Sequence, residues 1–322
     1  MVFGTKLGRA GRAWRTVRHL TARQWAWRLR NRGARAVIVV RPRLFERWLR
    51  RQAAALPPPE PRMAAADRVV RYQTYLHGAH LQEMRAGRFT FLNRTVDLGP
   101  WPALDWRVDL GEANNPLWRM NLSYFGYLVP MLAEGRLTSL RAASALIKDF
   151  DMNNGPGAPG ALRDAWTPFS TAIRIVNLLT AWTAYRRTGG PPDDAAEQVI
   201  AEHVRRCAAF TWWLREEELG FNHLLKNFAG LAVYAGCADG PLPWQDKLSR
   251  ALPACADRQI LPDGGHVERS PMYQALVLQD LEVAAECWPP VTEALAPVVD
   301  RTRTALSAML HPDREIALFN DA

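Results

Sequence analysis

A long succession of helical patterns, each ended by a glycine or proline turn, constrains the fold of this chain more than any other feature. From about residue 116 onwards, apolar residues recur near every 3.6 residues, most clearly in "PFSTAIRIVNLLTAWTAYRRTGG", residues 168–190. Several predicted helices are apolar on more than one face, as expected for an inner layer that an outer layer covers. Because the turns are short, consecutive helices should be antiparallel. The pattern therefore predicts an all-α double layer of antiparallel helix pairs.

The first 53 residues differ in composition and are predicted to form a separate basic helical segment. Residues 1–51 hold 15 Lys or Arg and one acid, although the whole chain has a net charge of +9. Trp and Leu alternate with Arg there, as on a basic amphipathic helix that binds a membrane surface, a polyanion or an acidic partner domain. No nucleic-acid-binding module accompanies the charge, so we expect no nucleic-acid partner. A proline-rich linker, "AALPPPEPRM" at 54–63, follows the segment.

Other classes of protein are disfavoured by what the sequence lacks. The sequence contains no run of 18 apolar residues that would predict a transmembrane helix, and no signal peptide is visible. The sequence by itself therefore favours a cytoplasmic location. The four cysteines form no CxxC pair and are expected to be buried free thiols. His77 and His80 are an isolated pair, so we expect neither a metal site nor a cofactor.

The stretch "DGGHVERSPMYQ", residues 263–274, places a tyrosine at the start of a predicted helix. The preceding turn residues favour a tight reversal, Ser270 is typical of an N-cap, and Pro271 of a first helical residue. Tyr273 then lies in the first turn, where the helix dipole and Arg269 would lower the pKa of its phenol. The alternative is that Tyr273 is an ordinary half-buried helix residue.

A second polar cluster lies in "GFNHLLKNFAGL", residues 220–231. Asn222 and His223 begin a predicted helix, and Lys226 and Asn227 follow one turn later on the same faces. A His with two Asn and a Lys is less typical of a solvated helix face than Glu and Lys are, and indicates a cavity as an alternative to solvent.

Two further stretches supply groups that suit a sugar-binding cleft. Arg174 lies on a strongly apolar helix, where it needs water, a carboxylate of the protein or an anionic ligand. "PLWRMNLSYFGYL", residues 116–128, adds Trp118, Arg119, Asn121 and Tyr124. Aromatic faces pack on sugar rings, and forked donors bind hydroxyls and carboxylates.

Four segments occur in an order and at separations that resemble a known family: "PLWRMNLSYFGYL", "WTPFSTAIRIVN", "GFNHLLKNFAGL" and "LPDGGHVERSPMYQALVLQDL". Together they resemble the toroid domain of the heparinase II/III-like polysaccharide lyases, a group that includes related alginate lyases. The resemblance covers roughly residues 85–322, and the basic N-terminus is similar to that of members found among bacterial exopolysaccharide genes. It implies an incomplete (α/α) toroid over 64–310. Residues 311–322 would begin the connection to a β-sandwich domain that this sequence lacks.

The resemblance also implies β-elimination on a uronic acid in an acidic polysaccharide, and with it a periplasmic location. Asn222 and His223 would neutralise the substrate carboxylate, His223 being an alternative base, and Tyr273 would act as general base, general acid or both. The residues expected to contact or support the substrate are Trp118, Arg119, Asn121, Tyr124, Arg174, Asn227, His266, Glu268 and Arg269. In this family a further histidine usually comes from the β-sandwich, so a partner domain or chain would complete the site.

Two alternatives remain at this point. The first is a glycan-binding or exopolysaccharide-assembly protein that keeps the cleft without a complete active site. The second is an inverting glycoside hydrolase, which needs two carboxyl groups about 6.5–9.5 Å apart. Its candidates would be Glu216, Glu217, Glu218, Asp263 and Glu268, although a run such as "REEE" is typical of a solvated face.

Overall fold

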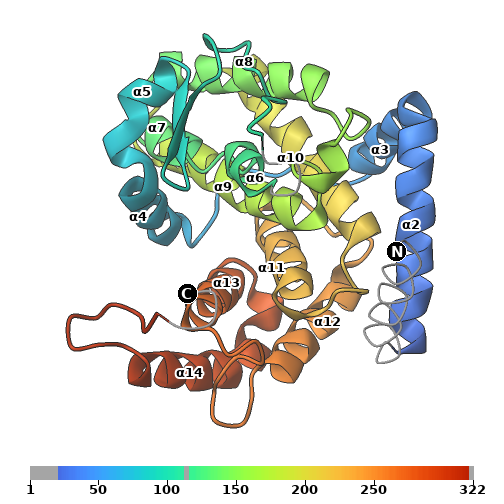
Figure 1. Ribbon diagram of the computed structural model, residues 1–322, viewed down its shortest axis with the longest axis vertical. Coiled ribbons are helices and arrows are strands. Elements are labelled where there is room, and N and C mark those ends of the chain that lie inside the picture. Colours follow the sequence, from blue (N-terminus) through green and yellow to red (C-terminus); the bar gives the residue numbers. More distant parts are fainter. Residues whose placement is uncertain (1–20, 112–115, 319–322) are drawn as a thin grey trace, which may run out of the picture.

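The computed structural model describes residues 21–111 and 116–318, and these are mostly helical (Figure 1). The helices are α2 (Ala22–Val40), α3 (Pro42–Ala54), α4 (Ala66–His77), α5 (Leu81–Arg85), α6 (Leu117–Ser123), α7 (Leu128–Leu132), α8 (Leu137–Asn153), α9 (Pro168–Arg187), α10 (Asp194–Leu214), α11 (Phe221–Cys237), α12 (Gln245–Gln259), α13 (Pro271–Cys287) and α14 (Thr292–Ala308). Short 3₁₀ turns lie at η1 (Gly78–His80), η2 (Ala161–Arg163) and η3 (Pro289–Val291). The predicted all-α class is confirmed.

Helices α9, α11 and α13 form an inner layer, with α11 packed between the other two. Two contacts between α11 and α13 occur in the same order along both helices. Lys226 bonds to Asp280, and further along both helices Gly236 lies against Cys287. The two helices therefore run in the same direction, and their first turns lie at the same end of the layer. On the outside, α10 packs on α9, α12 on α11 and α14 on α13.

The inner helices approach each other closely at two glycines of α11. A Cβ on Gly236 would lie 2.0 Å from the carbonyl oxygen of Cys287, and one on Gly230 would lie 2.8 Å from that of Ala172. Both separations are shorter than van der Waals contact, so only glycine allows these backbones to meet. The apolar run "NFAGLAVYAGC" is thus explained by helix packing.

One predicted helix is wrong. The apolar pattern of residues 117–135 suggests a single helix, but the chain forms α6 and α7 with a break between them, where Phe125 has a φ of 58°. Gly126 follows, and a Cβ there would lie 2.5 Å from Oε1 of Gln73 in α4. The close approach of α4 therefore interrupts a pattern that is locally compatible with a continuous helix.

Short β-prone runs in residues 89–110, broken by Gly-Pro and Trp-Pro, predict an irregular ribbon before the main domain, and part of it is a regular hairpin. Strands β1 (Arg88–Phe91) and β2 (Arg94–Asp97) pair antiparallel around Leu92 and Asn93, which both have positive φ. Phe89 and Phe91 point into the core and pack against Tyr127. The hairpin thereby covers the break between α6 and α7.

The basic segment is fixed to the rest of the chain by α2, which extends along one side of the molecule (Figure 1). Asn31 donates to the Glu218 carboxylate at 2.7 Å, and Arg30 donates to the carbonyl oxygen of Trp213 at 2.5 Å. On a different face, Leu29 and Val40 are 63% and 70% exposed. The membrane contact expected of this segment stays a prediction, and residues 1–20 lie outside the described part of the chain.

Three further expectations can be compared with the described residues. All four cysteines are free and buried, as predicted. No helix within residues 21–111 or 116–318 has the length and apolar character needed to cross a bilayer. The proline-rich stretch packs against α11, where the carbonyl oxygen of Pro57 accepts a hydrogen bond from the Tyr234 hydroxyl at 2.6 Å.

Candidate functional site

The start of α13 is built as the sequence predicts. The Ser270 side chain caps the helix by accepting from the Tyr273 amide at 3.4 Å, and Pro271 is the first helical residue. The preceding turn is tied to the helix by Gln274, which accepts from the His266 amide at 2.6 Å and donates to the carbonyl oxygen of Gly264 at 2.8 Å. Tyr273 is therefore held, half-buried, in the first turn of a fixed helix start.

Removing this cap tests how firmly the turn depends on it. We expect Ser270→Ala to lower the free energy of unfolding by about 1 kcal/mol, because the Tyr273 amide loses its acceptor. The matched control is Ser307→Ala in α14, whose exposed hydroxyl bonds to the carbonyl oxygen of Arg303 in its own helix. Urea unfolding of both variants measures the difference. Equal stabilities would show that Ser270 contributes nothing as a cap.

The first turn of α11 carries a histidine positioned by a buried glutamate. Nδ1 of His223 lies 3.3 Å from Oε1 of Glu216, while the histidine side chain keeps 42% of its surface exposed. Glu216 is 3% exposed and is fixed twice by Asn227, which donates to Oε2 at 3.1 Å and accepts from the Glu216 amide at 2.8 Å. The glutamate engages Nδ1, which leaves Nε2 to face a ligand.

Glu216 also changes the charge of this histidine. Burial by itself would lower the pKa of His223, but the hydrogen bond and negative charge of Glu216, together with the charge of Glu268, outweigh burial and raise it above 6.5. The protonated form is thus favoured at higher pH than in a free histidine. A raised folded-state pKa stabilises the protein fully below 6.5, and that stabilisation is lost as the pH rises through the raised value.

The raised pKa of His223 can be measured directly. We expect Glu216→Gln to lower the pKa of the imidazole in an NMR titration, because a neutral amide removes the largest favourable charge. Glu217→Gln is the matched control, since the adjacent carboxylate binds Arg23 and Arg215 instead. An unchanged pKa in Glu216→Gln would contradict the assigned partner.

Other polar and aromatic groups surround His223. The centroid of the Phe169 ring, in the first turn of α9, lies 4.7 Å from that of the His223 ring. The backbone amide of Asn222 donates to Oε1 of Glu268 at 3.1 Å. Glu268 comes from the turn before α13, so this bond connects the starts of α11 and α13. Lys226 lies near the Phe169 ring and bonds to Asp280 of α13 at 2.5 Å.

Tyr124 lies beside the same cluster, within hydrogen-bonding reach of Ser170 and within the field of Glu216. Burial raises the pKa of its phenol, and the nearby carboxylate adds to that increase. Tyr124 is therefore suited to donating a hydrogen bond and poorly suited to losing a proton.

No family model and no curated protein matches the sequence. The solved structures similar to it include heparan sulfate lyase HepC from Pedobacter heparinus, at 15% identity and a TM-score of 0.54, covering 84% of this chain and 44% of that one. A heparinase III gene product is 14% identical with a TM-score of 0.51, covering 70% of this chain and 39% of that one. The chain has a polysaccharide lyase-like fold. It spans less than half the length of either similar lyase.

Within this lyase-like fold, two expected substrate contacts are wrong. Arg174 has no exposed surface, and its guanidinium donates to the carbonyl oxygens of Ser123 at 2.6 Å and Ala165 at 2.5 Å. Trp118 is buried beside Phe91 and donates to the carbonyl oxygen of Arg94 at 3.0 Å. Both side chains hold backbone segments together in the core and leave no surface for a sugar.

Other residues expected to contact the substrate are engaged with groups of the protein itself. Asn227 is fully buried on Glu216, and His266 is buried against Gln259, where burial lowers its pKa. Arg119 pairs with buried Asp164 at 2.9 Å. Asn121 bonds to the carbonyl oxygen of Leu117 in its own helix, and Arg269 is an exposed residue with a φ of 53° immediately before the cap.

The structure also places at the site residues that the lyase resemblance did not select. Glu216 was expected on a solvated face, yet it is buried at the centre of the site. Asp280 and Phe169 lie on inner helices and meet Lys226 and His223 only through helix packing. The "REEE" run is in fact divided, because Glu217 pairs with Arg23 and Glu218 with Asn31 on the outer side.

Proposed function

We propose that this chain is the toroid part of a polysaccharide lyase that cleaves a uronate-containing glycan by β-elimination. The observation that carries the proposal is the shared location of two helix starts. Asn222 and His223 lie in the first turn of α11, and Tyr273 lies in the first turn of α13. The two helices are parallel, and the hydrogen bond from the Asn222 backbone amide to Glu268 joins their starts. The lyase-like fold supports the same reaction class.

The proposed role of Asn222 and His223 is to neutralise the substrate carboxylate. A proton on C5 of a uronate is only weakly acidic while the neighbouring carboxylate is charged. A donor pair that stabilises the enolate-like intermediate lowers the free-energy barrier to removing the C5 proton. Such electrostatic stabilisation is usually the largest catalytic contribution. The raised pKa of His223 favours the imidazolium, which donates more strongly than a neutral ring.

The proposed role of Tyr273 is proton transfer. Its phenolate would take the C5 proton, and the phenol so formed would give that proton to the leaving oxygen at C4, with no net change in the enzyme. The starts of α9, α11 and α13 carry the positive ends of three helix dipoles, which favour both a carboxylate and a transient phenolate. Tyr124 is the weaker candidate for the base, because burial raises its pKa.

A hydrolase with two catalytic carboxylates fits the site less well. Glu216 is buried and engaged by His223 and Asn227, and Glu217 pairs with two arginines. Asp263 accepts from the Gly265 amide within its turn. Glu268 accepts from the Asn222 amide, so no pair of free carboxylates faces the first turn of α11 among the described residues.

The unmatched length of the lyases leaves room for a further partner. We propose that a β-sandwich domain or chain closes the cleft and adds another histidine, as the sequence resemblance implies. The alternative, glycan binding without turnover, uses the same residues. It predicts glycan affinity but no product, with or without a β-sandwich domain.

The experiment is an ultraviolet absorbance assay with heparan sulfate, alginate and a bacterial exopolysaccharide. Elimination leaves a conjugated C4=C5 double bond that absorbs, whereas hydrolysis leaves none. We expect absorbance to rise with at least one substrate, alone or after a β-sandwich domain is added. No increase under either condition, with retained glycan affinity, would favour the binding protein and overturn the lyase.

A further inference from the structure

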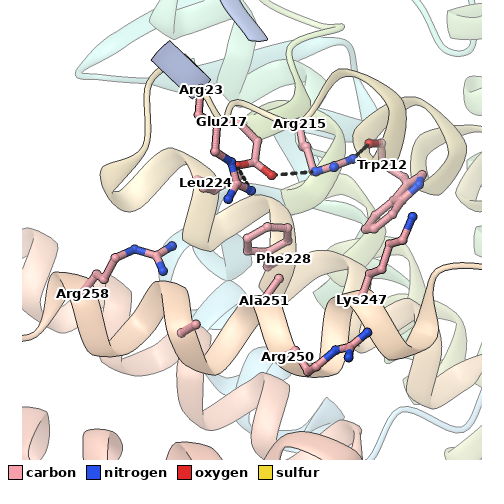
Figure 2. A pocket seen from close by; sticks show the side chains of 11 residues that line it. Arg23, Trp212, Arg215, Glu217, Leu224, Phe228, Lys247, Arg250, Ala251 and Arg258 are labelled. Carbon is pink, nitrogen blue, oxygen red and sulfur yellow. Dashed lines mark hydrogen bonds and ion pairs between the residues drawn. The ribbon is translucent and has the colours of Figure 1, made fainter. Parts of the chain in front are cut away.

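A strongly basic cavity lies outside the candidate site, between α2, the end of α10, and α12 (Figure 2). Its volume is about 330 Å³. The residues that line it are Arg23, Trp212, Arg215, Glu217, Leu224, Phe228, Lys247, Arg250, Ala251, Ala254 and Arg258. We name it the basic pocket. It has five cationic side chains and one carboxylate, so its charge favours an anion.

The cations of the basic pocket are only partly neutralised. Glu217 is shared by Arg23 at 2.9 Å and Arg215 at 3.1 Å. Across residues 21–111 and 116–318, neither the Lys247 ammonium nor the Arg258 guanidinium has a hydrogen bond or an ion pair with another group. Residues 1–20 contain Lys and Arg but no acid, so they offer no carboxylate to this surface. The pocket therefore carries uncompensated positive charge on a concave surface.

The wall of the pocket is ordered before any ligand binds. The guanidinium of Arg215 lies between two indole rings, 4.4 Å from Trp27 of α2 and 4.3 Å from Trp212 of α10. Trp212 in turn stacks on Trp244 with ring centroids 5.0 Å apart. Leu224 and Phe228 also line the pocket, and Figure 2 shows Phe228 below Arg215 and Glu217. Fixed cations on a concave, partly apolar wall suit a ligand that carries an acidic group.

A second cavity adjoins the basic pocket on the side of the first turn of α11. It shares Leu224 and Arg258 with the basic pocket, and Gly220, Phe221 and Val267 also line it. These residues immediately precede Asn222 and Glu268. The second cavity therefore places the basic pocket near the chain segments that carry Asn222 and Glu268.

We propose that the basic pocket is a second, non-catalytic binding site for acidic glycan chains. The ligand class rests on the proposed function, whereas the pocket's preference for anions rests on its own charges. A phospholipid headgroup shares this anionic chemistry, but exposed Leu29 and Val40 lie on a different face of α2 from Trp27. A membrane on that apolar face would not cover the pocket. The second site raises affinity for long chains over short ones, because a chain held at one site is already concentrated near the other.

The test compares two double variants with equal loss of charge. Lys247→Ala/Arg258→Ala removes the two free cations of the pocket, and Arg47→Ala/Lys148→Ala removes two exposed cations of α3 and α8. Fluorescein-labelled alginate and heparan sulfate, each as a tetrasaccharide and as a long chain, are titrated into the full chain carrying Tyr273→Phe. We expect the pocket variant to bind one of the long chains about tenfold more weakly and the control to bind it unchanged.

The remaining outcomes are separable. Equal affinity of both variants for both long chains would overturn the proposal. Loss of binding to phosphatidylglycerol vesicles, with glycan affinity intact, would also overturn it and assign the pocket to headgroups. If the protein with Tyr273 forms no unsaturated product with or without an added β-sandwich domain, but the tenfold loss is observed, the lyase is refuted and the second glycan site stays in place.

Discussion

Replacing Tyr273 with phenylalanine is expected to lower kcat/KM on a uronate polysaccharide by about 10²- to 10⁴-fold, the usual contribution of a positioned general acid or base. The change removes one hydroxyl and retains the ring in the first turn of α13, so the helix cap from Ser270 to the residue 273 amide persists. Glycan affinity should stay within about twofold, because proton transfer contributes to the transition state and little to the bound ground state.

The control for this substitution is Tyr75→Phe, a loss of the same hydroxyl at a side chain that is 85% exposed in α4. It should leave both parameters unchanged. Steady-state kinetics on an active substrate, together with equilibrium binding, separate the two effects. A fully active Tyr273→Phe enzyme would refute the assigned role of Tyr273.

Replacing Arg174 with alanine is expected to lower the free energy of unfolding by about 3–5 kcal/mol. The substitution leaves the carbonyl oxygens of Ser123 and Ala165 buried without their donor. It also removes a guanidinium packed over the rings of Phe150 and Trp166, at 4.6 Å and 5.4 Å. Arg174→Lys should have an intermediate effect, since one ammonium on a flexible stem does not reproduce the planar fork.

Chemical denaturation with Arg47→Ala as the exposed control measures this loss. If Arg174→Ala kept full stability but lost glycan affinity, Arg174 would be a ligand contact after all, and its assigned structural role would be wrong. The result also bears on Tyr124, because Arg174 fixes the carbonyl of the residue before it.

The sequence predicted the parts of the site that depend on local signals. The adjacent residues Ser270 and Pro271 define a helix start, so the position of Tyr273 in the first helical turn follows from the local sequence. The all-α class likewise follows from periodicity. The break at Phe125 does not, because it depends on contact of Gly126 with Gln73, a residue more than fifty positions earlier.

The remaining errors have one physical cause. A single sequence shows that Arg174 needs a partner, but it does not say whether the partner is a ligand or a distant backbone carbonyl. Glu216 was assigned to solvent because glutamate runs are usually exposed, whereas packing of α11 buries it on Asn227. Both assignments depend on which helices meet, and local patterns do not record this.

The most direct test of the account is the mass of the cleavage products formed in oxygen-18-labelled water. Elimination breaks the C4–O bond without adding water, so each new unsaturated end is one water lighter than a hydrolysis product and contains no labelled oxygen. The account predicts such unlabelled, unsaturated ends, and their loss in Tyr273→Phe. Saturated non-reducing ends, heavier by one water than the unsaturated ones, would establish hydrolysis and contradict the proposed β-elimination.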